Sequence, residues 1–281
     1  MPPRAPAPRV SAPAPPSAVK VPAKSFTVAP WIGSGEGEKI LLYGPSGQGK
    51  TTLAAMAPDP VFVGCDDGGR KIVHPKTGQI LNHIPGVATF EDVRAALQSD
   101  VFTNCASIVI DTVTELQEWA LRFMYRTIRG PQGTTAANIE DYGYSKGYRH
   151  LRDTMHLLLP DFDSWVRRGK NVILLCQAAT MKERTEGADY LKDGPDLSHN
   201  GMGSVRNDYI AWADHVFRIN WQSASVSKER KITPVSGRVI QTQPDASFHA
   251  KSRGSRFTDA PVVAFERPDD DSLWTLLFGG E

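Results

Sequence analysis

Cysteine is scarce in this 281-residue chain, which contains only Cys65, Cys105 and Cys176. Their number is odd and no C-x-x-C pair occurs, which argues against a disulfide framework and a structural zinc site. The sequence also lacks a run of 18 apolar residues, which excludes a membrane-spanning helix, and it lacks an apolar N-terminal stretch typical of a secretory signal. These absences predict a protein of the reducing cytoplasm with no membrane partner.

Net charge is nearly absent too, at +1, but the charges are unevenly distributed. Residues 1–24 hold four basic residues, no acidic residue and 8 of the 21 prolines, which leaves −3 for the remainder. Such a segment buries too little apolar surface to offset its ordering entropy. We expect a disordered basic tail at 1–30, a folded domain at 31–265 and a C-terminal segment at 266–281. The tail is either a solvated leader or a weak tether for nucleic acid or another protein.

Short apolar runs recur along the chain between stretches with helical spacing. The runs predict buried strands at 39–43, 61–63, 107–110 and 171–176. The helical stretches lie at 50–57, 89–98, 113–128 and 144–168, the last interrupted by Pro160. Continuous apolar strands separated by helices predict an α/β fold, with a mainly parallel sheet and helices on both faces.

The later part of the chain departs from this alternation. Residues 179–207 are polar and contain several glycines, which predicts a long loop. Residues 213–221, 228–233 and 238–242 are separated by Ser/Gly turns and predict antiparallel strands. We therefore expect an antiparallel C-terminal extension of the parallel sheet.

The most specific signal is a glycine-rich segment between an expected strand and an expected helix. It consists of Gly44, Pro45, Ser46, Gly47, Gln48, Gly49, Lys50, Thr51 and Thr52. It matches G-x-x-x-x-G-K-[ST] in the strand–loop–helix setting that this P-loop motif requires. Backbone N–H groups of such a loop surround phosphate oxygens, Lys50 would reach the β- and γ-phosphates during catalysis, and the Thr51 hydroxyl would bind Mg²⁺. The segment predicts ATP and Mg²⁺ as cofactors.

Asp111 follows the strand expected at 107–110. A P-loop protein needs a carboxylate at such a position to hold Mg²⁺, usually through water. An aspartate at a strand end is by itself more often a helix cap. Together with the upstream P-loop, its position predicts a second metal-site residue.

With these residues, the chain resembles the RecA-like branch of P-loop ATPases. Within that branch it is similar to the phage-type AAA-family nucleotide-binding proteins linked to single-strand annealing and recombination. The similarity spans roughly residues 36–265, and segments 110–116, 144–148, 169–174, 212–214 and 250–253 carry it. It implies a RecA-like fold and, for a phage-encoded protein, a location in the host cytoplasm.

The resemblance implies roles for further positions. The catalytic carboxylate that polarises water corresponds to Asp67, with Asp66 as the alternative; both are shorter than the usual glutamate, and a plain turn remains the other interpretation. Gln177 corresponds to a sensor of the γ-phosphate, or else makes a strand-end hydrogen bond. Lys251 and Arg253 correspond to a pair that reaches a neighbouring subunit's nucleotide in trans, or else lie on a solvated strand.

The resemblance places single-stranded DNA at two segments, 129–145 and 179–207. Their charge is mixed, so the electrostatic signature of DNA binding is weak. Tyr142, Tyr144 and Tyr190 are candidates for stacking on bases, although aromatic residues in such segments are as often packed against the domain.

The function that we predict from the sequence is an assembling ATPase, a ring or filament of identical chains, that acts on single-stranded DNA in recombination or annealing. Recombination or replication proteins are further expected partners. The alternatives are a ring helicase or helicase loader, a small-molecule kinase, and a nucleotide-gated binding module with little turnover. The shortened carboxylate at Asp67 keeps the last alternative open.

Overall fold

The computed structural model describes residues 28, 35–65, 69, 71–185, 188–200, 203–222, 224–226, 232–234 and 237–279. The expected tail therefore lies, apart from Val28, outside the described residues. The chain divides into two units, Met1–Ser34 and Gly35–Glu281, and the following concerns the second unit.

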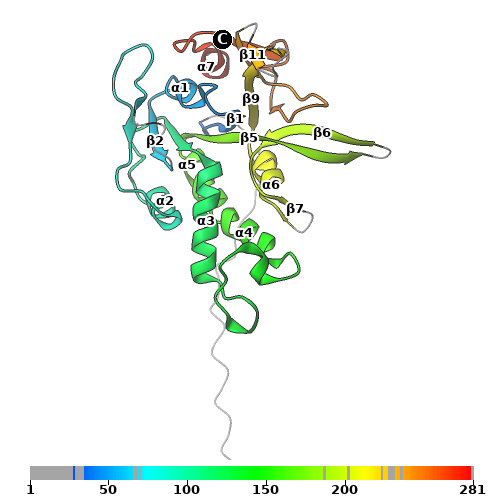
Figure 1. Ribbon diagram of the computed structural model, residues 1–281. Helices are drawn as coiled ribbons and strands as arrows, with labels where there is room; N and C mark the ends of the chain where they lie inside the picture. The colour runs from blue at the N-terminus through cyan, green and yellow to red at the C-terminus, as the bar shows by residue number, and fades with distance from the viewer. Residues whose placement is uncertain are drawn as a thin grey trace, which may run out of the picture. The chain divides into compact units, whose positions relative to one another are not determined.

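A mostly parallel sheet forms the centre of this unit (Figure 1). Its parallel strands, in spatial order, are β9 (His215–Trp221), β1 (Lys39–Gly44), β5 (Asn171–Thr185), β4 (Ser107–Asp111), β2 (Pro60–Gly64) and β3 (Asn82–His83). Strand β5 lies between β1 and β4, and it pairs in parallel with both. The carboxyl ends of these three strands, which carry the P-loop, Gln177 and Asp111, therefore meet at one edge.

Antiparallel strands extend the sheet beyond β9, as the sequence predicts. These are β12 (Arg238–Gln241) and β14 (Val262–Phe265), with the short β13 (Lys251–Ser252) also paired with β9. Strand β9, expected at 213–221, is antiparallel to β12 as predicted, but on its other side it runs parallel to β1. Helix α6 (Val205–Trp212) precedes β9 and supplies the crossover that a parallel strand needs.

Helices cover both faces of the sheet. They are α1 (Lys50–Ala54), α2 (Phe90–Leu97), α3 (Val113–Thr127), α4 (Lys146–His156), α5 (Leu158–Val166), α6 and α7 (Ser272–Phe278). Side chains of β1 alternate between two cores: Ile40 and Leu42 pack with α1 and α7, whereas Leu41 and Tyr43 pack with α2 to α6. This arrangement confirms the predicted α/β class.

Local signals fixed several helix boundaries correctly. The Thr89 hydroxyl accepts a hydrogen bond from the Asp92 N–H at 3.2 Å, so Thr89, the first residue of the stretch expected to be helical at 89–98, is the N-cap of α2. The amphipathic stretch at 144–168 forms two helices that meet at Leu157, and Pro160 lies in the first turn of α5, where proline is tolerated. Two 3₁₀ turns, Pro131–Gly133 and Ile139–Tyr142, connect α3 to α4.

The prediction of a long loop at 179–207 is wrong. Strand β5 continues past Gln177 to Thr185 and pairs with β6 (Ala188–Pro195) in an antiparallel hairpin, which extends away from the sheet in Figure 1. A second small hairpin, β7 (His199–Asn200) with β8 (Gly203–Ser204), leads into α6, and β10 (Ala224–Val226) pairs with β11 (Ile232–Pro234). The β5–β6 hairpin begins directly after the expected sensor residue.

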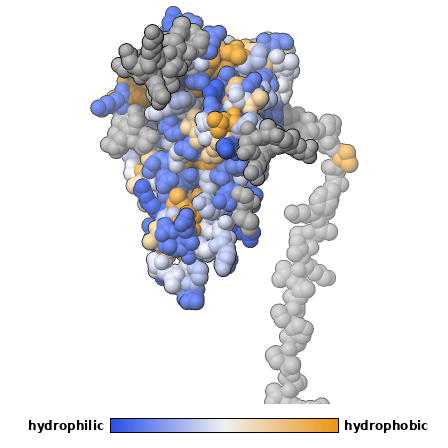
Figure 2. All heavy atoms as spheres, turned by 45° about the vertical axis from the view of Figure 1, so that its right-hand side comes forward, coloured by the Kyte–Doolittle hydropathy of each residue, from blue (hydrophilic) through white to orange (hydrophobic). Residues whose placement is uncertain are grey.

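Helix α7 packs on the helix that follows the P-loop. Leu273, Trp274 and Leu277 are buried, and the Trp274 Nε1 donates to the Leu53 carbonyl oxygen at 2.7 Å. On the face that Figure 2 shows, hydrophilic residues predominate and hydrophobic ones lie in small separate areas. Among the described residues, no helix combines the length and the apolar character needed to cross a membrane.

Candidate nucleotide-binding site

The glycine-rich segment forms the loop between β1 and α1. Gly47 and Gly49 have φ angles of +75° and +90°, which residues with a side chain rarely adopt. Gly49 is the N-cap of α1, and no side chain caps the helix there. The local backbone therefore has the features of an anion-binding loop at a helix start.

Lys50 connects this loop to strand β5. The side chain is buried, with 6% exposure, and its ammonium donates to the Gly44 carbonyl at 2.9 Å and the Pro45 carbonyl at 3.0 Å. It also donates to the Gln177 Oε1 at 2.9 Å. The lysine is thus held across the mouth of the loop, in contact with the residue predicted to sense the γ-phosphate.

Thr51 and Asp111 meet across the same edge of the sheet. The Thr51 hydroxyl donates to the Asp111 Oδ2 at 2.7 Å, and the Asp111 residue is buried, with 5% exposure. A hydroxyl and a carboxylate in contact are the hard oxygen ligands that Mg²⁺ prefers. Thr51 and Asp111 therefore fit the predicted Mg²⁺ and would hold it.

Thr114, to which no sequence motif points, links α3, the helix that follows Asp111, to Gln177. Its hydroxyl accepts from the Gln177 N–H at 3.0 Å and lies 3.1 Å from the Cys176 Sγ. Burial raises the pKa of Cys176 to about 12, so this residue stays a thiol at neutral pH. Thr114 thereby fixes the backbone at the point where β5 leaves the sheet.

A cavity of about 820 Å³ opens beside Asp111. Its lining includes Glu115, Trp119 and Arg122 of α3 and, next to the end of β2, Cys65. The Cys65 N–H donates to the Asp111 carbonyl at 2.7 Å, which holds the end of β2 next to that of β4. The space next to Asp111 is therefore large enough for a further molecule or chain segment.

With this geometry in place, the family can be assigned. The AAA domain family matches residues 36–254. This chain belongs to the AAA domain family. Membership and the P-loop geometry together support nucleotide binding and hydrolysis as the class of activity.

A comparison of the sequence with curated proteins finds no match. Among solved structures, it is similar to a KaiC-like protein from the hyperthermophilic archaeon Pyrococcus horikoshii, with 14% sequence identity and a TM-score of 0.41. That similarity covers 83% of this chain and 88% of the archaeal one.

The predicted catalytic carboxylates, Asp67 and Asp66, lie outside the described residues. The chain is described up to Cys65, at the carboxyl end of β2, and again at Gly69. Their role in polarising water therefore stays a prediction.

Lys251 and Arg253 lie at the opposite end of the sheet from the P-loop. Lys251 pairs with Val216 near the start of β9, and its ammonium donates to the Ile210 carbonyl at 2.8 Å. Arg253 donates to the Asp214 Oδ1 at 2.6 Å. Both cations contact the end of α6, so within one chain they do not reach the nucleotide site.

The three tyrosines considered for DNA contact have different environments. Tyr142 is buried, and its hydroxyl lies 3.1 Å from the carbonyl oxygens of Met124 and Ile128, so it is a core residue. Tyr144 is 97% exposed. The Tyr190 hydroxyl donates to Glu183 on the neighbouring strand of the hairpin. Of these, Tyr144 is the one that presents its ring to solvent.

Proposed function

We propose that this AAA-domain protein binds and hydrolyses ATP and acts as an assembly on single-stranded DNA in recombination or annealing. One observation carries the proposal: Lys50 bridges the P-loop carbonyls and Gln177, from which the β5–β6 hairpin extends. The ammonium that would contact the β- and γ-phosphates thus also binds Gln177, the residue directly before the hairpin. Nucleotide state and hairpin position are linked by one side chain.

The residues at the site have separate tasks in this proposal. The loop N–H groups bind and orient the phosphates, and Lys50 exchanges its carbonyl contacts for phosphate oxygens as charge develops on them. Bound Mg²⁺ would neutralise phosphate charge, with Thr51 and Asp111 holding it. Asp67 or Asp66 would accept a proton from the attacking water.

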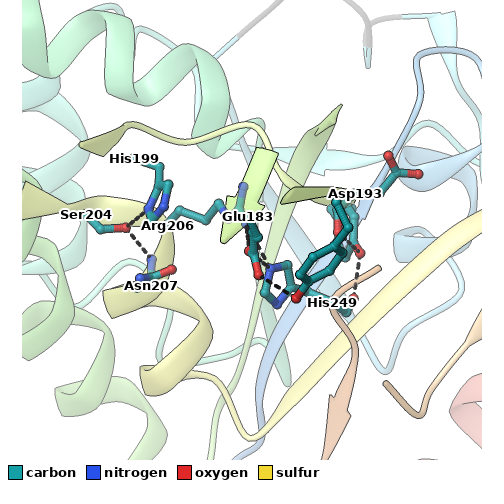
Figure 3. Close-up of polar contacts among 9 residues, drawn as sticks. Glu183, Asp193, His199, Ser204, Arg206, Asn207 and His249 are labelled. Atoms are coloured by element: carbon teal, nitrogen blue, oxygen red, sulfur yellow. Dashed lines mark hydrogen bonds and ion pairs between the residues drawn. The ribbon is translucent and has the colours of Figure 1, made fainter. Parts of the chain in front are cut away.

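A polar network holds the hairpin to the domain (Figure 3). Arg206 of α6 is fully buried and donates to the Glu183 Oε1 at 2.6 Å, and the His249 Nε2 lies 2.8 Å from the same oxygen. At the hairpin base, Arg218 donates to Asp193 and the Thr180 hydroxyl donates to the other Asp193 oxygen at 2.6 Å. The hairpin is therefore an ordered arm rather than a loose loop, suited to carry a change at Gln177 outward.

DNA would contact the hairpin and the segment around Tyr144. Lys182 pairs with Leu191, which is 62% exposed, and Lys192 pairs with Met181 on the other face of the hairpin. The exposed ring of Tyr144 offers a stacking surface. Because few cations are involved, we expect binding of modest strength that weakens as salt rises.

The experiment that tests this proposal measures the ATPase rate against protein concentration, with and without single-stranded DNA. We expect stimulation by DNA and a rate per chain that rises with concentration, and no activity from Lys50→Ala. Absence of both hydrolysis and DNA binding at low salt contradicts the proposal. Tight nucleotide binding without turnover would instead identify a nucleotide-gated module, and strand displacement would identify a helicase.

A further inference from the structure

Arg238, the first residue of β12, contacts the P-loop from 190 residues further along the chain. Its Nη1 donates to the Gln48 carbonyl oxygen at 3.0 Å, and its Nη2 donates to the Glu266 carbonyl oxygen at 3.4 Å. The guanidinium carbon lies 4.3 Å from the centre of the Phe265 ring. The planar group is thus fixed by two carbonyls and an aromatic face.

The contact at Gly49 is close. A Cβ placed on Gly49 would lie 2.5 Å from the Arg238 Nη1 and 3.1 Å from the Phe265 Cε1. Both distances are shorter than ordinary contacts between such atoms, so side chains of β12 and β14 occupy the space next to the loop. The peptide between Gln48 and Gly49 therefore rests against the antiparallel extension of the sheet.

Within the part of the chain that the structure describes, no carboxylate pairs with Arg238, and both of its hydrogen-bond acceptors are backbone carbonyls. Burial lowers the pKa of this guanidinium, which nevertheless stays charged at neutral pH. A partly buried cation in contact with a loop strengthens the loop's attraction for anions.

We propose that Arg238 is a positioning residue of the nucleotide site, which fixes the Gln48–Gly49 peptide and adds positive charge to the phosphate-binding loop. This inference rests on the proposed binding of ATP at that loop. It makes nucleotide affinity depend on the antiparallel strands, which the P-loop motif does not include. Because Arg238 acts through the loop backbone, its loss raises the Kd for nucleotide and the KM, and leaves kcat at saturating ATP nearly unchanged.

The test compares Arg238→Ala, Arg238→Lys and Arg267→Ala in the full chain, using a fluorescent ATP analogue with Mg²⁺. Arg267 is exposed, pairs with Asp269 and lies near the same strand end, so its variant is the matched control. We expect Arg238→Ala to raise the Kd roughly 10-fold or more, as for loss of a hydrogen bond from a charged group. The Kd of Arg238→Lys should lie between those of the wild type and Arg238→Ala, since an ammonium keeps the charge but cannot make both hydrogen bonds and stack on Phe265.

Added methylguanidinium should restore part of the affinity of Arg238→Ala and leave Arg267→Ala unchanged. Unliganded thermal stability is measured alongside, because a merely structural role would lower stability without changing the Kd of the folded protein. Wild-type affinity in folded Arg238→Lys and Arg238→Ala would overturn the inference. Failure of the wild-type chain to bind nucleotide would instead overturn the proposed function, and Lys50→Ala supplies the non-binding reference.

Discussion

Gln177 has two contacts with different consequences. Its side-chain oxygen accepts from Lys50, and its backbone N–H donates to Thr114. Lys50 keeps two carbonyl partners without it. The side chain is therefore dispensable for holding the P-loop, whereas the link from the loop to the hairpin depends on it.

We predict that Gln177→Ala keeps nucleotide affinity close to wild type but lowers DNA-stimulated ATP hydrolysis roughly 10- to 100-fold, the range for a hydrogen bond to a charged group. Steady-state ATPase assays with and without single-stranded DNA measure this. Gln98→Ala is the control. Gln98 is exposed, caps the end of α2 and donates to Asp161 of α5, away from the nucleotide site. Full DNA stimulation in Gln177→Ala would remove the sensor role.

Among the elements, α4 and α6 are joined by one carboxylate. Asp208 of α6 accepts from the Arg152 Nε at 2.6 Å and lies 2.7 Å from the His156 Nε2. Burial raises the pKa of Asp208, but the hydrogen bonds from Arg152 and His156 outweigh it, so the pKa lies below its ordinary value of 3.8. A carboxyl whose pKa is lower in the folded than in the unfolded state stabilises the folded protein at every pH above its unfolded-state pKa. This stabilisation is lost as the pH falls through the folded-state pKa.

Asp208→Asn should therefore lower the free energy of unfolding by about 1.5 kcal/mol at neutral pH. The difference from wild type should shrink as pH falls through the lowered pKa of Asp208, where the wild-type carboxyl becomes protonated. Urea unfolding at several pH values measures both effects. Asp153→Asn, an exposed change on α4, is the control, and a difference that does not depend on pH would contradict the assignment.

Helix α7 allows a matched pair of substitutions. Leu277 is fully buried and Leu276 is 39% exposed. We expect Leu277→Ala to lower the free energy of unfolding by about 2–5 kcal/mol, the cost of a buried cavity. Leu276→Ala should change it by less than about 0.5 kcal/mol. Equal effects in chemical unfolding would mean that α7 does not pack on α1 as described.

The elements also explain how far the sequence could predict this fold. The P-loop, β4 with Asp111 and the cap at Thr89 were predictable because each depends on neighbouring residues. The β5–β6 hairpin was not, since the residues of its two strands beyond Gln177 show no regular apolar alternation. The direction of β9 depends on the crossover through α6, which apolar spacing does not encode.

The same reasoning applies to the candidate site. Lys50, Thr51, Asp111 and Gln177 were predicted and converge, because parallel strands bring their carboxyl ends to one edge of the sheet. The contact of Arg238 with Gln48 joins positions 190 residues apart, and no local motif marks it. For Tyr142 the structure favours packing against the domain over stacking on bases, a choice that an aromatic residue in a polar segment does not reveal.

At the scale of the whole molecule, the two ends of the sheet differ in chemistry. The P-loop and Asp111 lie at the carboxyl ends of the parallel strands, and Lys251 and Arg253 lie at the other end. Head-to-tail contacts between such unlike ends produce rings or filaments. In the proposed assembly, the basic pair of one chain would approach the nucleotide of the next.

Mixing two inactive variants tests this arrangement. Lys50→Ala keeps the basic pair but loses its own nucleotide, and the double variant Lys251→Ala with Arg253→Ala keeps its P-loop but loses the pair. If the pair acts in trans, the mixture should hydrolyse ATP at least roughly 10-fold faster than either variant alone, because a finger cation contributes several orders of magnitude. ATPase assays across mixing ratios, with light scattering to confirm assembly, measure this. Wild-type activity in the double variant, or mixed assemblies that stay inactive at every ratio, would leave Lys251 and Arg253 as partners of the α6 carbonyls and Asp214 alone.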